Sequence, residues 1–227
     1  MRLAIIYTAL IMSAGGVYAL DIQGHRGARG LAPENTLPAF AQALAIGVTT
    51  LELDCAVTKD GVVVVSHDPA FNPDITRGPD GKWLEKTGPA IWSLTYQDIQ
   101  RYDVGRLNPA NDYAKRWPEQ RPVDGTRIPR LADVFGLVKK SGNETVRFNI
   151  ETKISPLAPD ETATPEDFAR KLISAVRSTG MAERTAIQSF DWRTLQVVQK
   201  EAPGIPTDYI TVEKGFMDSI QADNQSS

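Results

Sequence analysis

The sequence predicts an α/β fold of the TIM (β/α)8-barrel class. Apolar segments with the length of strands recur near residues 22, 51, 149, 187 and 209. Four segments between them have apolar residues at helical spacing, and this alternation is typical of a parallel sheet with crossover helices. Eight strands with their helices need about 250 residues. Because the chain has 227 and ends in a polar run, we expect a barrel truncated at its C-terminal end.

The composition is that of an ordinary globular protein. Hydrophobic residues make up 41% of the chain and charged residues 23%, which suffices for one large domain. The formal net charge is -3, so there is no excess of positive charge for binding a nucleic acid, and we expect no such partner. The sequence leaves the oligomeric state open, including a homo-oligomer.

Residues 1–19 have the pattern of a secretory signal peptide. Arg2 gives a positive start, residues 3–12 are apolar, and Val17-Tyr18-Ala19 has the form of a cleavage site. A membrane anchor is the alternative, but this apolar run is short for a bilayer. We therefore expect a mature domain of residues 20–227 that is periplasmic or secreted, without stable membrane insertion after cleavage.

The N-terminal third predicts a strand, a helix and a second strand. A short strand precedes His25, and a helix follows with Asn35 as its N-cap and Gly47 at its end. The next strand covers residues 48–57. This strand–helix–strand unit predicts two parallel strands.

The following segment is expected to fold back on the second strand. Thr58-Lys59-Asp60-Gly61 is a tight turn, and the strand after it leads to His67. A connection of this length is too short for a parallel crossover, so this pair is antiparallel. Residues from about 69 to 128 then form an insertion. We expect it to cover the mouth of the site, and a flap whose tryptophans only pack is an equal alternative.

Regular alternation resumes after the insertion. Pro165 at the start of one helix and Gly180 after its end mark its limits, and Asp191 is the expected N-cap of another. The elements expected here are helices over residues 131–140, 164–179 and 191–201 and strands over 147–152, 185–190 and 207–211.

Cys55 is the single cysteine, so no internal disulfide is expected in the exported protein. A nucleophilic role is one interpretation. However, Cys55 lies on the same face of its strand as two leucines, which favours a buried, unreactive side chain.

Titratable residues gather at the predicted ends of strands. The two histidines of the chain are His25 and His67, and Leu51-Glu52-Leu53-Asp54 places two carboxylates on one strand face, with Glu151 on another strand. Ends of parallel barrel strands converge on one mouth. Neighbouring carboxylates repel one another unless a cation lies among them, and an all-oxygen site favours Ca²⁺ or Mg²⁺ over Zn²⁺.

The other polar residues suit an anionic substrate. Arg26 and Lys153 carry positive charge that a phosphodiester would use, and two histidines that titrate near neutral pH can act as general acid and general base. Each group also has a structural interpretation as an ion pair or a polar loop residue. The functional interpretation is favoured because all of them fall at predicted strand ends.

Seven short motifs stand in order along the chain: His25-Arg26-Gly27, Pro33-Glu34-Asn35-Thr36, Glu52-x-Asp54, Thr58-Lys59-Asp60-Gly61, Ser66-His67-Asp68, Asn149-Ile150-Glu151-Thr152-Lys153 and Gln188-Ser189-Phe190. Together, over about residues 22–211, they resemble the glycerophosphodiester phosphodiesterase family. The family pattern continues past the end of this chain to further strands and a tryptophan-containing motif.

The resemblance implies a metal-dependent TIM-barrel enzyme of glycerol and lipid metabolism that hydrolyses glycerophosphodiesters to sn-glycerol 3-phosphate and an alcohol. In such enzymes the glycerol hydroxyl of the substrate attacks the phosphorus, and water opens the resulting cyclic phosphate. The implied roles are His25 and His67 as acid and base, Glu52, Asp54 and Glu151 as ligands of one divalent cation, Arg26 and Lys153 as phosphate contacts, and Glu34 and Asn35 as substrate-binding or supporting residues.

Two alternatives differ in class. A related phospholipase, such as a sphingomyelinase-D-like enzyme, would be expected to expose apolar loops, whereas the 69–128 insertion is polar apart from its tryptophans. A non-catalytic, exported glycerophosphodiester-binding protein would use the same pocket without turnover. The presence of both histidines favours an enzyme. The sequence does not decide between Ca²⁺ and Mg²⁺ or identify the alcohol.

Overall fold

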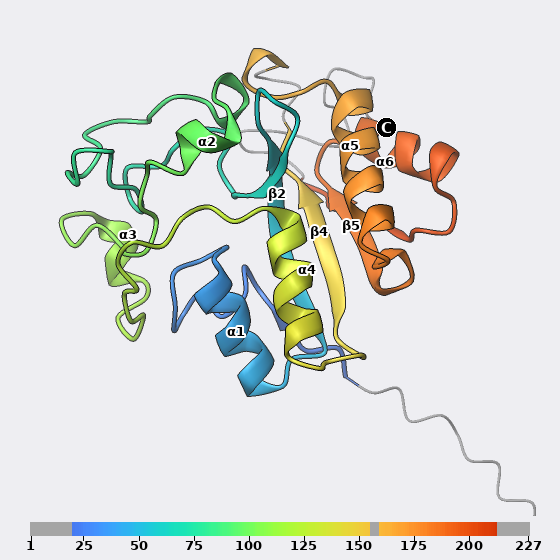
Figure 1. Cartoon of the computed structure of the whole chain (residues 1–227), viewed down its shortest axis with the longest axis horizontal. Coiled ribbons are helices and arrows are strands. Elements are labelled where there is room, and N and C mark those ends of the chain that lie inside the picture. Colours follow the sequence, from blue (N-terminus) through green and yellow to red (C-terminus); the bar gives the residue numbers. More distant parts are fainter. Residues whose placement is uncertain (1–19, 155–158, 213–227) are drawn as a thin grey trace, which may run out of the picture.

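A computed structural model describes residues 20–154 and 159–212 of the chain (Figure 1). Within them the sheet has five parallel strands that neighbour one another in chain order, and a sixth that pairs with β2 alone. This sequential parallel order, with a helix in each connection between consecutive parallel strands, is the arrangement of a TIM barrel. The parallel strands are β1 (Gln23–Gly24), β2 (Thr50–Val57), β4 (Arg147–Thr152), β5 (Thr185–Ser189) and β6 (Thr207–Tyr209).

The predicted antiparallel excursion is confirmed. Strand β3 (Val63–Val65) pairs with the end of β2, and Thr58 and Gly61 close the turn between them through a backbone hydrogen bond of 2.9 Å. The pairing directs the chain back over the C-terminal end of β2. His67 therefore lies next to the carboxyl ends of the parallel strands.

Four crossover helices occupy the predicted places. Their apolar faces pack against the sheet because each repeats buried residues at helical spacing. Figure 1 shows α4 in front of the sheet, between α1 and the pair α5 and α6. The helices are α1 (Leu37–Ile46), α4 (Leu131–Lys140), α5 (Pro165–Ser178) and α6 (Trp192–Glu201).

The main core lies between these helices and one face of the sheet. Leu51, Leu53 and Cys55 of β2 point into it and are fully buried. The predicted packing role of Cys55 is confirmed, and burial raises the pKa of its thiol well above the ordinary value. Because strand side chains alternate, the residues between these three face the opposite side, where the polar groups gather.

The start of α1 differs from the prediction. Thr36, not Asn35, is the N-cap, and its hydroxyl accepts a hydrogen bond from the backbone N–H of Ala39. Asn35 adopts a left-handed backbone conformation, with φ of 56°, and its side chain binds Asp54. The sequence offers two neighbouring residues that can cap a helix, and a contact with another strand decides which of them does so.

The segment between β3 and α4 forms a second, smaller core. The buried side chains of Phe71, Ile91 and Ile99 pack there with Ala56 and Val64. Thr95 and Asp98 form a capping box at the start of the short helix α2 (Tyr96–Ile99), and a further short helix is α3 (Asp112–Lys115).

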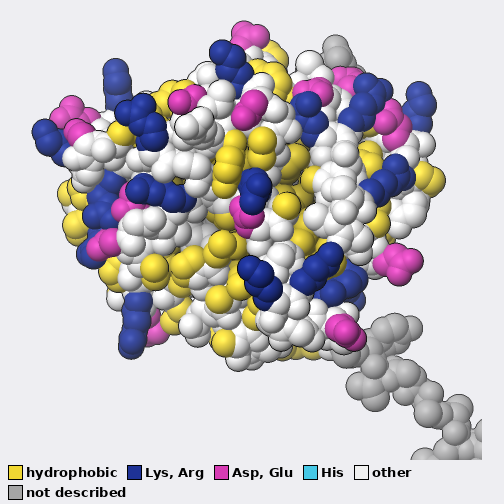
Figure 2. All heavy atoms as spheres, viewed as in Figure 1, with side chains coloured by type: hydrophobic (Ala, Val, Ile, Leu, Met, Phe, Trp, Pro, Cys, Tyr) yellow, Lys and Arg dark blue, Asp and Glu magenta, His cyan; other side chains and the backbone are white. Residues whose placement is uncertain are grey.

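The three tryptophans of this segment have different partners. Trp92 packs against the main core, whereas Trp83 and Trp117 each lie under an arginine guanidinium. Basic and acidic side chains are interspersed over the face shown in Figure 2, in keeping with the small net charge of -3.

The predicted signal peptide lies outside the described residues. Among the helices that are described, none combines the length and the apolar character that crossing a bilayer would require.

Replacing Gly136 with alanine should stabilise the protein. Gly136 is inside α4, and a Cβ atom added there would meet nothing within 4 Å. We expect Gly136→Ala to raise the free energy of unfolding by about 0.5–1 kcal/mol, because alanine loses less backbone entropy in a helix. Urea unfolding measures the change.

Gly27→Ala is the contrasting variant. Gly27 has a φ of 79°, and a Cβ atom there would lie 2.7 Å from the backbone carbon of Ala39. This variant should lower the free energy of unfolding. A Gly136→Ala protein that is no more stable than the original would contradict the account of α4.

Candidate active site

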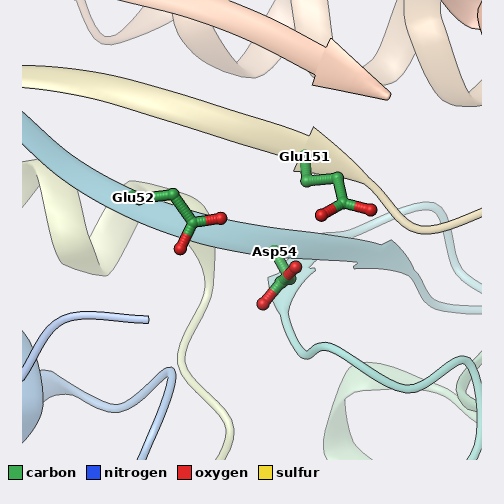
Figure 3. A group of neighbouring side chains, drawn as sticks. All are labelled: Glu52, Asp54 and Glu151. Atoms are coloured by element: carbon green, nitrogen blue, oxygen red, sulfur yellow. The ribbon is translucent and has the colours of Figure 1, made fainter. Parts of the chain in front are cut away.

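The three predicted metal ligands lie side by side on two neighbouring strands. Asp54 of β2 is in register with Glu151 of β4, and Glu52 precedes Asp54 by two residues on the same face. One carboxylate oxygen from each residue lies within 4.8 Å of the others. Figure 3 shows the three carboxylate groups converging on one space beside the sheet.

Burial and mutual repulsion disturb the titration of this acidic cluster. Glu52 is 7% exposed, and burial together with the negative charge of Asp54 raises its pKa to about 8. Burial also raises the pKa of Glu151, and Asp54 adds to this effect. Two of the three carboxyl groups therefore resist ionisation as the chain stands.

Asp54 behaves in the opposite way. Its burial would raise the pKa, but the positive charges of Lys153, His67 and Arg26 overcome this effect and lower it. The side chain of Asn35 also donates a hydrogen bond of 2.8 Å to Asp54 Oδ2. Asp54 is thus held as a carboxylate at the centre of the site.

The geometry and chemistry of the cluster fit a hard divalent cation. All three donors are carboxylate oxygens, which Ca²⁺ and Mg²⁺ prefer. A cation among them would remove the repulsion that adds to the effect of burial on the pKa of Glu52. These residues therefore form a site that could bind a metal ion.

The two positively charged residues predicted to bind phosphate, Arg26 and Lys153, already have acidic partners. Arg26 donates from Nη1 to Glu34 Oε1 at 2.7 Å, and its Nε lies 3.3 Å from Asp54 Oδ2. Lys153 donates to Glu151 Oε1 at 2.7 Å and lies 3.8 Å from Asp54 Oδ1. Arg26 has a left-handed φ of 53°, which is uncommon for a residue other than glycine.

His25 does not match the expected titration near neutral pH. Partial burial and the positive charges of Arg29 and Arg26 lower its pKa to about 4. Arg29 Nη2 donates a hydrogen bond of 3.0 Å to His25 Nδ1, so the proton of the neutral imidazole lies on Nε2. That nitrogen is 3.8 Å from Glu52 Oε2. The expected titration near neutral pH is wrong for His25 because neither its partial burial nor its contact with Arg29 is visible in the local sequence.

His67 is oriented by its neighbour. Its Nδ1 lies 2.9 Å from Asp68 Oδ1, and Asn72 donates a hydrogen bond of 2.8 Å to the other oxygen of Asp68. This contact places a proton on Nδ1 and leaves Nε2 free to exchange one. His67 also lines a hollow together with Glu34 and Asn35.

The nine predicted site residues thus form one continuous group, but the sequence interpretation missed several of their partners. Arg29 and Tyr113 were not identified; the hydroxyl of Tyr113 donates to Glu34 Oε2. Asp68 belongs to the Ser66-His67-Asp68 motif, and a carboxylate directly after a histidine could have indicated their hydrogen bond. Nothing in the sequence around Tyr113 indicates its contact, because Glu34 is 79 residues away.

Comparison with known proteins agrees with this geometry. Residues 25–218 match the Glycerophosphoryl diester phosphodiesterase family. The chain belongs to this family. A glycerophosphodiester phosphodiesterase of Caldanaerobacter subterraneus subsp. tengcongensis is 33% identical over 180 residues, which cover 79% of this chain and 61% of that enzyme.

Solved structures support the same fold. A candidate glycerophosphoryl diester phosphodiesterase from Silicibacter pomeroyi DSS-3 superimposes with a TM-score of 0.80 at 35% identity, over 86% of this chain and 66% of that one. A phosphodiesterase of Oleispira antarctica shares the fold with a TM-score of 0.64 at 19% identity, over 87% of this chain and 68% of that one. The chain spans less than two thirds of the length of the Caldanaerobacter relative, at 61%.

Without divalent cations, the contribution of Glu52 to stability should fall as the pH rises from about 4.5 to about 8, the ordinary and the raised pKa of Glu52. The lowered pKa of His25 acts in the opposite direction up to about pH 6.5, so the net stability of the chain should fall above that pH. Below this window the carboxyl group is protonated in both the folded and unfolded states. Within it the folded state holds a proton that the unfolded state has lost, so the free energy of unfolding falls by up to about 1.4 kcal/mol per pH unit. Urea unfolding in chelator across this range measures the slope.

Glu52→Gln should flatten this dependence, and Glu119→Gln, which alters an exposed carboxylate, should leave it unchanged. Addition of Ca²⁺ or Mg²⁺ should also flatten it, because a bound cation stabilises the ionised form. Equal slopes for the original chain and Glu52→Gln would contradict the raised pKa of Glu52.

Proposed function

We propose that this protein is a metal-dependent phosphodiesterase that hydrolyses glycerophosphodiesters to sn-glycerol 3-phosphate and an alcohol. The observation that carries the proposal is the joint placement of an acidic cluster and two histidines at the carboxyl ends of neighbouring strands. Family membership supports the same reaction class. The Oleispira antarctica phosphodiesterase was solved with the product sn-glycerol-3-phosphate, which supports this product.

Glu52, Asp54 and Glu151 would hold one divalent cation, Ca²⁺ or Mg²⁺. When bound, such a cation supplies Lewis-acid polarisation of phosphoryl oxygens and lowers the pKa of a hydroxyl group. The protein keeps the three ligands apart from bulk water, since each side chain is less than 10% exposed.

Arg26 and Lys153 would bind the phosphate. Both lie against the acidic cluster, and each has a carboxylate partner that fixes the direction of its side chain. Glu34 and Asn35 support this arrangement, because Glu34 accepts a hydrogen bond from Arg26 and Asn35 donates one to Asp54. The substrate phosphate would then meet cations that are already oriented.

The two histidines would divide the proton transfers. His67, with Asp68 on Nδ1, suits a general base that accepts the proton of the glycerol hydroxyl at Nε2, because the carboxylate stabilises the resulting imidazolium. His25, which directly precedes Arg26 in the sequence, would protonate the leaving alcohol. The negative charge of a bound phosphodiester favours the protonated form of His25 that this role needs.

The domain limits and location remain part of the proposal. Residues 20–227 would form the catalytic domain, with residues 69–128 as an insertion, and residues 1–19 would direct export to the periplasm or the outside of the cell. The charge and apolar pattern of residues 1–19 support this.

Glycerol 3-phosphate release from glycerophosphocholine and from glycerophosphoglycerol tests the reaction. The purified chain should release the product with Ca²⁺ or Mg²⁺ present, and a chelator should abolish release because the cluster then lacks its cation. Lack of product from folded protein on both substrates, under both metals, would contradict the proposed hydrolysis.

Substitution of either histidine separates an enzyme from a binding protein. His25→Ala and His67→Ala should each lower kcat by about 10²–10⁴-fold, the usual contribution of a general acid or base. Substrate affinity should change little. Arg170→Ala, at an exposed ion pair with Glu201, is the control and should retain full turnover. Turnover that survives both histidine substitutions would exclude the proposed acid–base pair.

A further inference from the structure

Arg29 lies beside the proposed acid His25 and is held there by an aromatic ring. Its guanidinium carbon is 4.4 Å from the centre of the Trp117 ring, and Nη2 donates to His25 Nδ1 at 3.0 Å. The backbone carbonyl of Arg29 accepts a hydrogen bond of 2.7 Å from Gln120. A stacked, planar guanidinium is preorganised for recognition because little side-chain entropy remains to be lost.

The charge of Arg29 has no acidic partner among the described residues. Arg26 and Lys153 are each paired with carboxylates at 2.7 Å, whereas the side-chain contacts of Arg29 are His25, Trp117 and the hydroxyl of Tyr113 at 3.5 Å. Arg29 is also half-buried, so water screens its charge incompletely. It therefore presents a net positive charge next to His25.

The surrounding site needs such a charge. Its acidic side chains are more numerous than the basic ones that they contact, Arg26 and Lys153. When a bound divalent cation ionises all five of them, the site still carries one negative charge in excess, which an approaching phosphodiester anion meets. The acidic side chains are those of Glu34, Glu52, Asp54, Asp68 and Glu151.

The same arrangement is unfavourable to a cationic alcohol. A quaternary ammonium group is commonly bound against the face of an aromatic ring. In this chain the guanidinium of Arg29 already covers one face of Trp117, an aromatic ring that lines a pocket together with His25. A choline group placed beside His25 would meet a like charge instead of a free ring.

We propose that the Arg29–Trp117 pair selects glycerophosphodiesters whose alcohol is neutral or anionic over those whose alcohol carries a quaternary ammonium group. This inference rests on the proposed function, because it assigns the substrate class of the same site. Arg29 acts as a specificity-determining residue at the place where the alcohol leaves.

Binding of two diesters that differ in the charge of the alcohol tests the proposal. Titration calorimetry would measure the Kd of sn-glycero-3-phosphoglycerol and of sn-glycero-3-phosphocholine in saturating Ca²⁺ or Mg²⁺ at low salt. His67→Ala would serve as the parent chain, so that neither ligand is consumed. We expect about tenfold tighter binding of the glycerol diester, the effect of one unit charge at roughly 8 Å in an effective dielectric constant of about 30.

Three further substitutions, each made in the His67→Ala chain, test whether Arg29 causes the preference for the glycerol diester. Arg29→Gln keeps a hydrogen-bond donor but removes the charge, and should bring the two Kd values within about twofold of each other. Arg29→Lys keeps the charge and should retain part of the preference. Arg116→Gln removes the charge of an exposed arginine that lies over Tyr113, and should leave the ratio unchanged.

Each outcome decides the question. Equal binding of the two diesters by the parent, binding of neither, or a preference that survives Arg29→Gln would overturn the proposal. A preference that Arg29→Gln removes and Arg29→Lys partly keeps would support it. If that preference is present while the original chain releases no glycerol 3-phosphate, the proposed hydrolysis fails and the selectivity of the site stands.

Discussion

The repulsion among three buried carboxylates is the constraint on which the site depends. Glu52, Asp54 and Glu151 are brought together by the parallel register of β2 and β4, which is itself fixed by the apolar residues on the opposite face. A shift of one residue would exchange the two faces and place the leucines of β2 in the polar interior. The stability of the core and the geometry of the cluster are therefore two results of one register.

The remaining polar residues of the site compensate this concentration of negative charge. Arg26, Lys153 and Asn35 all contact Asp54, and its low pKa follows from the cations among them and from His67. Burial and the negative charge of Asp54 raise the pKa of Glu52 to about 8, and no comparable cationic partner offsets them. Because cationic side chains hold the pKa of Asp54 low while the pKa values of Glu52 and Glu151 stay raised, a divalent cation would chiefly compensate the charges of Glu52 and Glu151.

The segment between β3 and α4 contributes to the site from its outer side. Tyr113 donates to Glu34, Gln120 binds the backbone of Arg29, and Trp117 stacks on its guanidinium. These contacts tie the segment to the loop that follows His25 and Arg26. The small second core around Phe71 and Ile99 gives the segment the rigidity that such support requires.

Much of the architecture follows from local patterns in the sequence. The strands, the crossover helices and the antiparallel β3 were predictable because apolar periodicity, caps and turn residues act within a few positions. The acidic cluster was predictable because Glu52 and Asp54 alternate with leucines and because parallel strand ends converge. Asn35 was wrongly expected to cap α1, since Asp54, 19 residues away, takes its side chain.

The sequence by itself determined the fold class, the family and the residues that meet at the strand ends. The tertiary structure alone decided their electrostatic state. The low pKa of His25 depends on its partial burial and on the position of Arg29, and Arg26 is held by Glu34, which Tyr113 holds in turn. Side-chain periodicity is a local property and is visible in the sequence, whereas a pKa or a hydrogen-bond partner depends on distances between residues that are far apart in the chain.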